Sequence, residues 1–141
     1  MSFSFQFPGG EAFYPVPSGS IEKAEERMGL AFPSELRAFY QQYGYGFLPS
    51  GEDNINRILD PMSAAHLRRR EEEFATYPDL DLLAPYEKDK LVFFEVNESA
   101  LFLIELGDGP RQAVYYYGEQ IAPSLEDFIT AYLRDERFYL K

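Results

Sequence analysis

The chain contains no cysteine, which excludes a disulfide framework and any zinc site built from thiolates. It contains a single histidine, His66, so nucleophile–base pairs and helical metal-ligand pairs have almost no residues to draw on. It also lacks an apolar run of membrane-spanning length, and its first residues lack the basic-then-apolar pattern of a secretory signal. These absences predict a cytoplasmic protein that is not an enzyme and that has no cofactor, metal site or membrane attachment.

Positive charge is scarce, with 13 Lys and Arg against 24 Asp and Glu and a formal net charge of −11. DNA, RNA and anionic membranes repel so acidic a surface, so we expect no direct nucleic-acid or membrane ligand. A basic protein partner is favoured instead. The alternative is that the acidity only keeps the protein soluble, and charge alone does not decide between the two.

The chain is long enough for one domain with its own core, because 45% of its 141 residues are hydrophobic and 17% are aromatic. We therefore predict a single domain over residues 1–141, with residues 1–19 as an N-terminal extension or edge strand. In that segment Phe3, Phe5 and Phe7 alternate with polar residues, which is the period of a half-buried strand. A mobile arm is the competing interpretation.

Two short amphipathic helices are predicted between Ser20 and Gly44. Ser20 can cap the first helix by accepting a backbone N–H bond, and Gly29 supplies the left-handed residue that ends it. Pro33 occupies the first turn of the second helix, where a missing N–H has no consequence. The apolar stripe of this second helix is expected to face the core and consists of Leu36, Phe39, Tyr40 and Tyr43.

The middle of the chain is predicted to contain a short strand, a helix and an irregular loop. The strand covers Asn56 to Leu59, and the helix covers Ser63 to Ala75. Spacing in this helix pairs Arg68 with Glu72 on a solvated face. From Thr76 to Lys90 no hydrophobic period survives, which indicates an acidic surface loop.

Three strands and a closing helix are predicted in the last third of the chain. The strands cover Leu91 to Val96, Ala100 to Leu106 and Ala113 to Tyr117, with hairpin-sized connections between them. Ser124 is expected to cap the last helix, with Asp127 three residues on. The predicted fold class is α+β: a mostly antiparallel or mixed sheet with a central three-strand meander, helices packed against it, a two-helix N-terminal segment and a C-terminal helix.

The most suggestive candidate for binding is the aromatic and glycine-rich stretch Tyr43-Gly44-Tyr45-Gly46-Phe47. It can form a loop that presents its rings to a partner, or a short strand whose rings fold inward. If the acidic loops lie beside it, aromatic anchors and carboxylates form one surface for a basic protein. The candidate partner-binding residues are Tyr45, Phe47, Glu52, Asp53, Asp79 and Asp81.

Several blocks of the sequence, taken in order, resemble a known family. These blocks are Ile21-Glu22 with Glu25, Met28-Gly29, Phe32-Pro33, Leu36 to Tyr40, Asn56-Arg57-Ile58-Leu59 with Pro61, Phe93-Phe94-Glu95-Val96 and Ile121-Ala122-Pro123-Ser124-Leu125-Glu126-Asp127-Phe128. Their order and spacing resemble the SUKH superfamily, and specifically the Smi/Knr-like branch, named for a yeast regulator of cell-wall synthesis and killer-toxin resistance. After the second helix the family usually shows an asparagine and glycines, whereas this chain has Tyr43-Gly44-Tyr45-Gly46.

The resemblance implies an α+β domain and, for bacterial members, an immunity protein or antitoxin used in competition between cells. Such a protein binds and neutralises a toxin domain, often a nuclease, and a nuclease carries a basic groove that an acidic domain can occupy. The resemblance carries no catalytic residues with it. Two alternatives stay open: a regulatory scaffold for cell-wall or envelope synthesis, and an acidic hydrolase that uses two carboxylates. The sequence leaves the oligomeric state open between monomer and homodimer.

Overall fold

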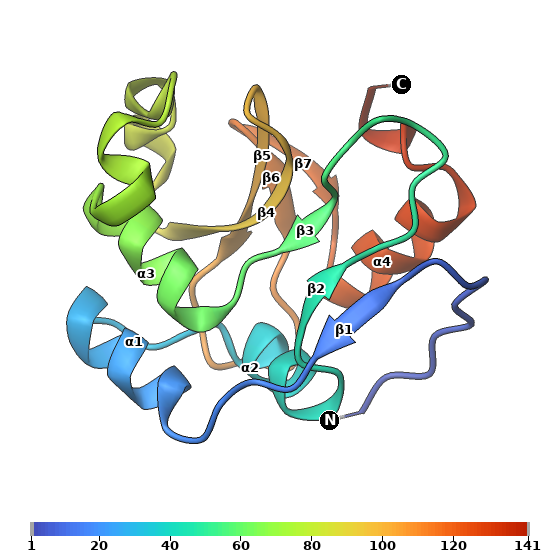
Figure 1. Ribbon diagram of the computed structural model, residues 1–141, viewed down its shortest axis with the longest axis horizontal. Helices are drawn as coiled ribbons and strands as arrows, with labels where there is room; N and C mark the ends of the chain where they lie inside the picture. The colour runs from blue at the N-terminus through green and yellow to red at the C-terminus, as the bar shows by residue number, and fades with distance from the viewer. Residues whose placement is uncertain (1, 141) are drawn as a thin grey trace.

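Seven strands of the described chain form one antiparallel sheet, and each strand pairs with its neighbour in the sequence. The computed structural model describes residues 2–140 and confirms the predicted α+β class (Figure 1). The strands are β1 (Ala12–Tyr14), β2 (Tyr45–Phe47), β3 (Arg57–Ile58), β4 (Lys90–Asn97), β5 (Ala100–Glu105), β6 (Val114–Tyr116) and β7 (Glu119–Ala122). The α-helices are α1 (Ser20–Met28), α2 (Ser34–Gln42), α3 (Pro61–Arg69) and α4 (Leu125–Arg134).

The predicted three-strand meander is confirmed as β4, β5 and β6. Val92 pairs with Leu103, and Phe94 pairs with Phe102 after a bulge at the intervening residue. These strands are buried because both of their faces carry apolar side chains. The strand β7, which closes a hairpin with β6, was not predicted, since its sequence Glu-Gln-Ile-Ala shows no clear alternation.

Helical layers cover the two faces of the central strands. On one face, the ring of Phe102 packs edge-on against Phe128 of α4, with their centroids 5.5 Å apart. On the other face, Leu101 lies with Pro78 and Leu83, which come from the segment that follows α3. Figure 1 shows α3 and α4 on opposite sides of the sheet, with α1 beside α3.

The N-terminal segment differs from the predicted half-buried strand, because residues 2–11 pair with no other strand. Its rings stack in sequence, with Phe3 5.4 Å from Phe5 and Phe5 5.6 Å from Phe7. Phe3 also contacts Phe39 of α2, and its backbone N–H and C=O bond to the side-chain amide of Gln42. The alternating phenylalanines therefore belong to an extended segment that packs on α2 without pairing in the sheet. The edge strand β1 begins only at Ala12.

The predicted cap of the first helix is wrong, although its predicted end is confirmed. Gly19 occupies the N-cap position with φ of 80°, and Ser20 is already the first helical residue. The Ser20 hydroxyl is buried without a hydrogen-bond partner. At the other end, Gly29 adopts φ of 74° and its N–H bonds to the Glu25 carbonyl. Gly19 displaces the cap by one residue because it takes the left-handed conformation without strain.

The third helix is shorter than predicted and ends at Arg69 instead of Ala75. Arg70 adopts the left-handed conformation with φ of 55°, which turns the chain out of the helix. The predicted pair between Arg68 and Glu72 does not form, and Arg68 donates to the Lys90 carbonyl instead. The left-handed conformation of Arg70 ends the helix. The Arg70 guanidinium then bonds to the Leu80 carbonyl and the Glu87 carboxylate, which lie further along the sequence.

Residues 72–86, the 3₁₀ segment, fold into three short 3₁₀ helices, whereas the sequence predicted a helix as far as Ala75 and an acidic surface loop from Thr76. Phe74, Leu80 and Leu83 are buried and fix the segment to the core. Arg70 holds the middle of the segment by donating to the Leu80 carbonyl at 3.1 Å, and holds the residue that follows it by donating to the Glu87 carboxylate at 2.7 Å. The segment is therefore an ordered wall beside the sheet.

Candidate partner-binding surface

One face of the sheet is covered over β4 and β5 but open over β1 and β2. A row of residues runs across this face from β1 to β5, each paired in register with the next one, so their side chains point to the same side of the sheet. The row consists of Ala12, Phe47, Arg57, Glu95 and Leu101. The 3₁₀ segment covers Leu101, which is 5% exposed. Phe47, at the other end of the row, is 36% exposed. The result is a shelf of two strands beside an ordered wall.

Three rings on this shelf, Tyr14, Tyr45 and Phe47, form an aromatic patch. Tyr14 is 47% exposed, and its ring centroid lies 5.7 Å from that of Tyr45 on the neighbouring strand. The stretch after α2 is thus a short strand, as in the second interpretation of the sequence. Its rings are only partly exposed, because Tyr45 is partly buried against the core and Phe47 is 36% exposed. Sequence reasoning did not include Tyr14, because only the strand register places it beside Tyr45.

The glycines between these rings allow β1 to approach closely. Gly44 and Gly46 have φ of 95° and 142°, and a Cβ atom on either would collide with the carbonyl oxygen of Tyr14 or Ala12, respectively. Both positions therefore need glycine for conformation and for space. The alternation of glycine and aromatic residues sets the strand pairing that holds the patch together.

An ionic row connects the aromatic patch to the 3₁₀ segment. Arg57 is the register partner of Phe47 on the neighbouring strand. Its guanidinium forms an ion pair with the Glu95 carboxylate, with 3.2 Å between nitrogen and oxygen. Tyr77 of the 3₁₀ segment donates its hydroxyl to the same carboxylate. Burial and this carboxylate raise the pKa of the Tyr77 phenol, so it stays protonated and keeps donating.

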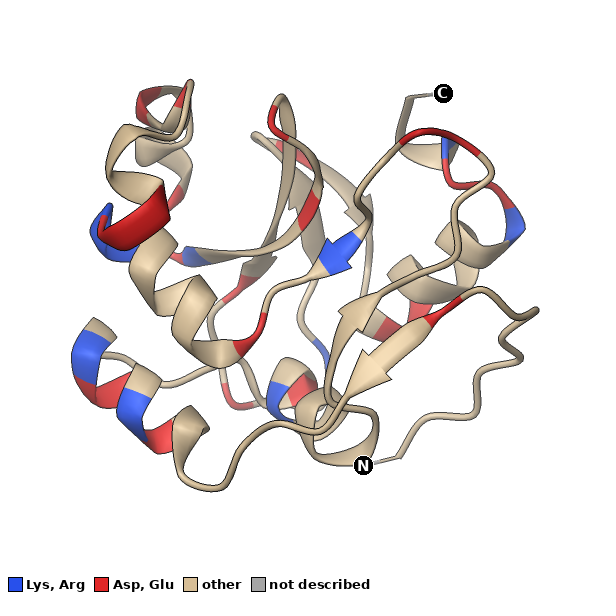
Figure 2. Cartoon of the chain, viewed as in Figure 1, with Lys and Arg blue, Asp and Glu red and all other residues tan. Residues whose placement is uncertain are grey.

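Carboxylates form an acidic rim along the end of the sheet where β4 turns into β5. The rim comprises Glu52, Asp53, Asp79, Asp81 and Glu98, all of them exposed. The Asn97 amide donates to Asn54 at 3.2 Å, which places the turn beside the β2–β3 loop, and Glu98 lines a small pocket with Asp79. Figure 2 shows these acidic positions along the upper edge of the molecule, on the β2–β3 loop, the β4–β5 turn and the 3₁₀ segment.

The structure separates the six predicted site residues into two groups. Tyr45 and Phe47 lie on β2, and Glu52 and Asp53 follow them in the next loop. Asp79 and Asp81 lie on the 3₁₀ segment, on the other side of the β4–β5 turn (Figure 2). Glu98, in the turn between the two groups, was not predicted, because a single acidic residue in a hairpin turn carries no signal of its own.

Few basic side chains of the described residues neutralise this rim. Arg137 lies 3.6 Å from Glu52, which is the one ion pair of a rim residue among residues 2–140. Other arginines are paired with acids outside the rim: Arg27 with Glu71, Arg37 with Glu25, Arg57 with Glu95 and Arg70 with Glu87. The rim therefore presents an excess of negative charge to solvent.

The loop of residues 48–56, which carries part of the rim, is held by one carboxylate. Glu136, just beyond α4, accepts hydrogen bonds from the Gly51 N–H at 2.5 Å, the Ser50 hydroxyl at 2.9 Å and the Asn56 amide at 3.0 Å. Burial acts to raise the pKa of Glu136, but the hydrogen bonds outweigh it and hold the pKa below the usual 4.5.

This loop is expected to loosen in acid. A carboxyl group with a lowered pKa in the folded state contributes stability above its unfolded pKa and loses that contribution as the pH falls through its folded pKa. The stability difference between the wild type and Glu136→Gln should therefore be largest near pH 7 and should shrink below pH 4.5. Urea unfolding of both proteins from pH 7 to pH 3 tests this, and a difference that stays constant would contradict it.

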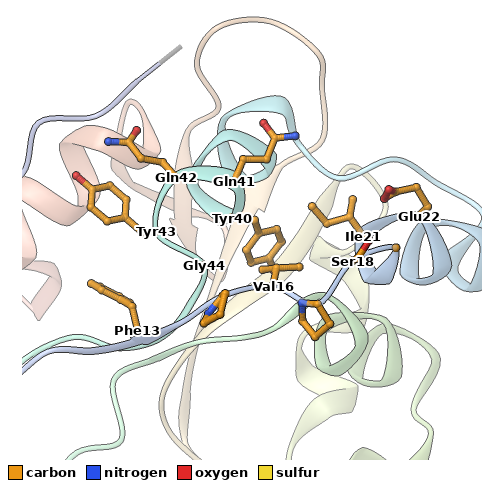
Figure 3. Close-up of a pocket in the computed structure, with 13 residues that line it drawn as sticks. Phe13, Val16, Ser18, Ile21, Glu22, Tyr40, Gln41, Gln42, Tyr43 and Gly44 are labelled. Carbon is orange, nitrogen blue, oxygen red and sulfur yellow. The ribbon is translucent and has the colours of Figure 1, made fainter.

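The largest cavity described lies between the last turn of α2 and the linker of residues 15–19, which connects β1 to α1 (Figure 3). Its volume is about 380 Å³. Apolar side chains line much of it, namely Phe13, Val16, Ile21, Tyr40 and Tyr43. Polar groups stand along one side in Figure 3, namely Gln41, Gln42 and Glu22. The Gln42 amide is already bonded to Phe3, so Gln41 and Glu22 are the groups that a ligand can reach.

Two kinds of feature are absent from residues 2–140. That part of the chain holds no group of three or more His, Asp or Glu side chains positioned to bind a metal ion. Its helices are all too short or too polar to cross a bilayer.

Comparison with known proteins places the chain in a family and shows its similarity to a named protein. The SMI1/KNR4 family (SUKH-1) matches residues 15–131, which is most of the chain. The chain is also similar to a Bacillus subtilis (strain 168) protein named immunity protein YxxD. The two are 45% identical over 141 residues, an alignment that covers 99% of this chain and 96% of the relative. The resemblance inferred from the sequence blocks is thereby confirmed.

Proposed function

Because the chain belongs to the SMI1/KNR4 family (SUKH-1), we propose that it is an immunity protein that binds and neutralises a toxin domain in competition between bacterial cells. The observation that carries this proposal is the 45% identity to an immunity protein along nearly the whole of both chains. The protein acts by stoichiometric binding in the cytoplasm and performs no catalysis. It meets the toxin there after the toxin enters the cell.

The charge of the chain supports a basic toxin. With a net charge of −11 and a rim of largely unpaired carboxylates, the protein attracts a positively charged partner from a distance. A nuclease fits this description, since it needs a basic groove to hold phosphates. Rim carboxylates that enter this groove take the place of the phosphates, so the toxin is blocked by competition for its own binding site.

We assign the contact to the aromatic patch and the acidic rim together. Aromatic side chains that are partly exposed, rigid and clustered supply most of the affinity in typical interfaces, while charges at the edge supply association rate and specificity. The contacts from Arg57 to Glu95 and from Glu95 to Tyr77 run from the strand beside the aromatic patch to the 3₁₀ segment. They fix the position of the 3₁₀ segment relative to the patch. We include in this surface the six residues predicted from the sequence, in their two groups, together with Tyr14 and Glu98.

Titration of toxin activity tests the proposal. The probe is the toxin domain encoded beside the gene for this chain, and complete inhibition is expected at about one protein per toxin. Tyr45→Ala should weaken binding about 30-fold, because it removes a central ring. Asp53→Asn should weaken it a few-fold, mainly through slower association, and the loss should vanish at high salt.

Two matched variants serve as controls. Tyr45→Phe keeps the ring and should bind within about threefold of the wild type. Glu119→Gln removes one exposed charge at the opposite edge of the sheet and should have no effect. Inhibition far below one-to-one stoichiometry would mean that the protein acts catalytically, and the absence of any complex would overturn the immunity role.

A further inference from the structure

The cavity between the α1 linker and α2 has a chemistry that the proposed surface does not use. Its lining consists of 13 residues, and none of them is lysine or arginine. The exposed Glu22 makes no ion pair with the described residues, and the exposed Gln41 makes no side-chain hydrogen bond with them. The cavity is therefore apolar on its walls and negatively polarised on its polar side.

The last turn of α2 adds to this polarisation. A helix leaves its last carbonyl groups without partners inside the helix and carries a partial negative charge at that end. A basic residue near the end of a helix compensates for this charge, but α2 has none in its last turn. Its final residues, Tyr40, Gln41 and Gln42, all line the cavity, so the negative end of the helix faces it.

Rigid elements hold the cavity open. Pro15 and Pro17 fix the backbone of the linker on both sides of Val16. Tyr40 anchors the opposite wall, because its buried hydroxyl donates to the Leu59 carbonyl at 2.7 Å. Gly44 closes the end of the cavity by its close approach to β1. A ligand thus meets a preformed site, which reduces the entropy lost on binding.

We infer that this cavity receives a cationic side chain, an arginine or lysine of the toxin, with its aliphatic stem between Val16, Ile21 and Tyr43 and its charged head at Glu22 and the end of α2. Long basic side chains combine these two requirements, an apolar stem and a cationic head. The net charge of −11 favours a basic toxin and disfavours a second copy of this chain as the occupant. That the cationic side chain belongs to a toxin rests on the proposed function. That the cavity binds a cationic side chain does not depend on it.

Substitution of Gln41 by lysine provides a test that misfolding cannot imitate. A lysine at this position adds a positive charge to the last turn of α2, which stabilises the helix, yet it repels the incoming cation. Binding of the toxin domain should weaken about tenfold while the melting temperature stays the same or rises. Gln120→Lys makes the same charge change on the exposed edge strand β7 and should weaken binding much less.

A second pair of variants tests the carboxylate. Glu22→Gln should weaken toxin binding several-fold, whereas Glu26→Gln, one turn further along the exposed side of α1, should leave it unchanged. If Gln41→Lys and Gln120→Lys weaken binding equally, or if neither weakens it while the wild type binds, the cavity inference is overturned and the immunity role stands. If the wild type itself forms no complex, the proposed function fails instead.

A probe that does not depend on the toxin separates the two questions. In a nuclear magnetic resonance titration, N-acetyl-arginine methylamide should produce saturable shifts at the backbone amides of Glu22 and Gly44. N-acetyl-leucine methylamide should produce much smaller shifts, and Gln41→Lys should remove the response to arginine. Equal responses to both compounds, or none to arginine, would overturn the inference.

Discussion

Replacing Glu35 with alanine is expected to lower the free energy of unfolding by about 4 kcal/mol, although Glu35 is not one of the proposed contact residues. Its carboxylate is 2% exposed and accepts three backbone hydrogen bonds, from Gln112 at 3.0 Å, Leu125 at 2.8 Å and Glu126 at 3.0 Å. Two of these donors belong to the first turn of α4, so a side chain of α2 caps α4 across the core. Alanine leaves the buried N–H groups of Gln112 and Leu125, and the partly buried N–H of Glu126, without this acceptor.

Urea denaturation of the wild type, Glu35→Ala and Glu35→Gln measures this effect. Glutamine keeps one acceptor oxygen, so its stability should fall between those of the other two proteins. Glu26→Ala removes an exposed carboxylate from α1 and should change the stability by no more than about 0.5 kcal/mol. A loss below about 1 kcal/mol for Glu35→Ala would show that water replaces the carboxylate.

Replacing Gly46 with alanine should lower the free energy of unfolding by about 3 kcal/mol and detach β1 from β2. Two effects add here, because Gly46 has a φ of 142° and its new Cβ would collide with the Ala12 carbonyl. The aromatic patch depends on this pairing, so the variant should also lose toxin affinity. Hydrogen exchange of the β1 and β2 amides, together with urea denaturation, measures both consequences.

Two other glycines separate conformational strain from collision. Gly9 has a φ of 101° with open space around it, so Gly9→Ala should cost about 1 kcal/mol from backbone conformation alone. Gly109 has neither a positive φ nor a close neighbour, so Gly109→Ala should be within about 0.5 kcal/mol of the wild type. Equal losses for Gly9→Ala and Gly46→Ala would show that the collision is relieved.

The features predicted correctly from the sequence are those with local causes. Ser124 caps α4 by accepting from Asp127, three residues away, and a short-range motif records that bond. The strands β4 and β5 are recognisable because continuous apolar runs flank a short turn. Gly29 ends α1 because a left-handed residue is needed at that point.

The features that sequence reasoning missed depend on residues far apart in the chain. Arg70 ends α3 early through a bond to Glu87, and nothing within a few residues of Arg70 signals this. Glu35 reads as an ordinary first-turn residue, because its three partners lie 77 to 91 residues away. The segment around Phe3 has the right period for a strand, but only the fold reveals that its neighbour is a helix.

The candidate surface shows the same division. Tyr45 and Phe47 were identified because rings alternate with glycines in one stretch of sequence. Tyr14 and Glu98 join the surface only through strand register and through the proximity of turns. Acidity along the sequence predicts negative charge, but the pairing of most arginines with other acids decides where that charge remains unbalanced.

The order of the strands in the sheet has a consequence for how the protein can fold while it is being synthesised. Each strand of the described sheet bonds to the strand that precedes it in the chain, from β1 to β7. During synthesis each strand can therefore pair once it has left the ribosome, because the strand to which it bonds has already been made. The Glu35 carboxylate, by contrast, gains the Leu125 and Glu126 N–H groups as partners only after all seven strands have been made, so α4 is capped later than the sheet is paired.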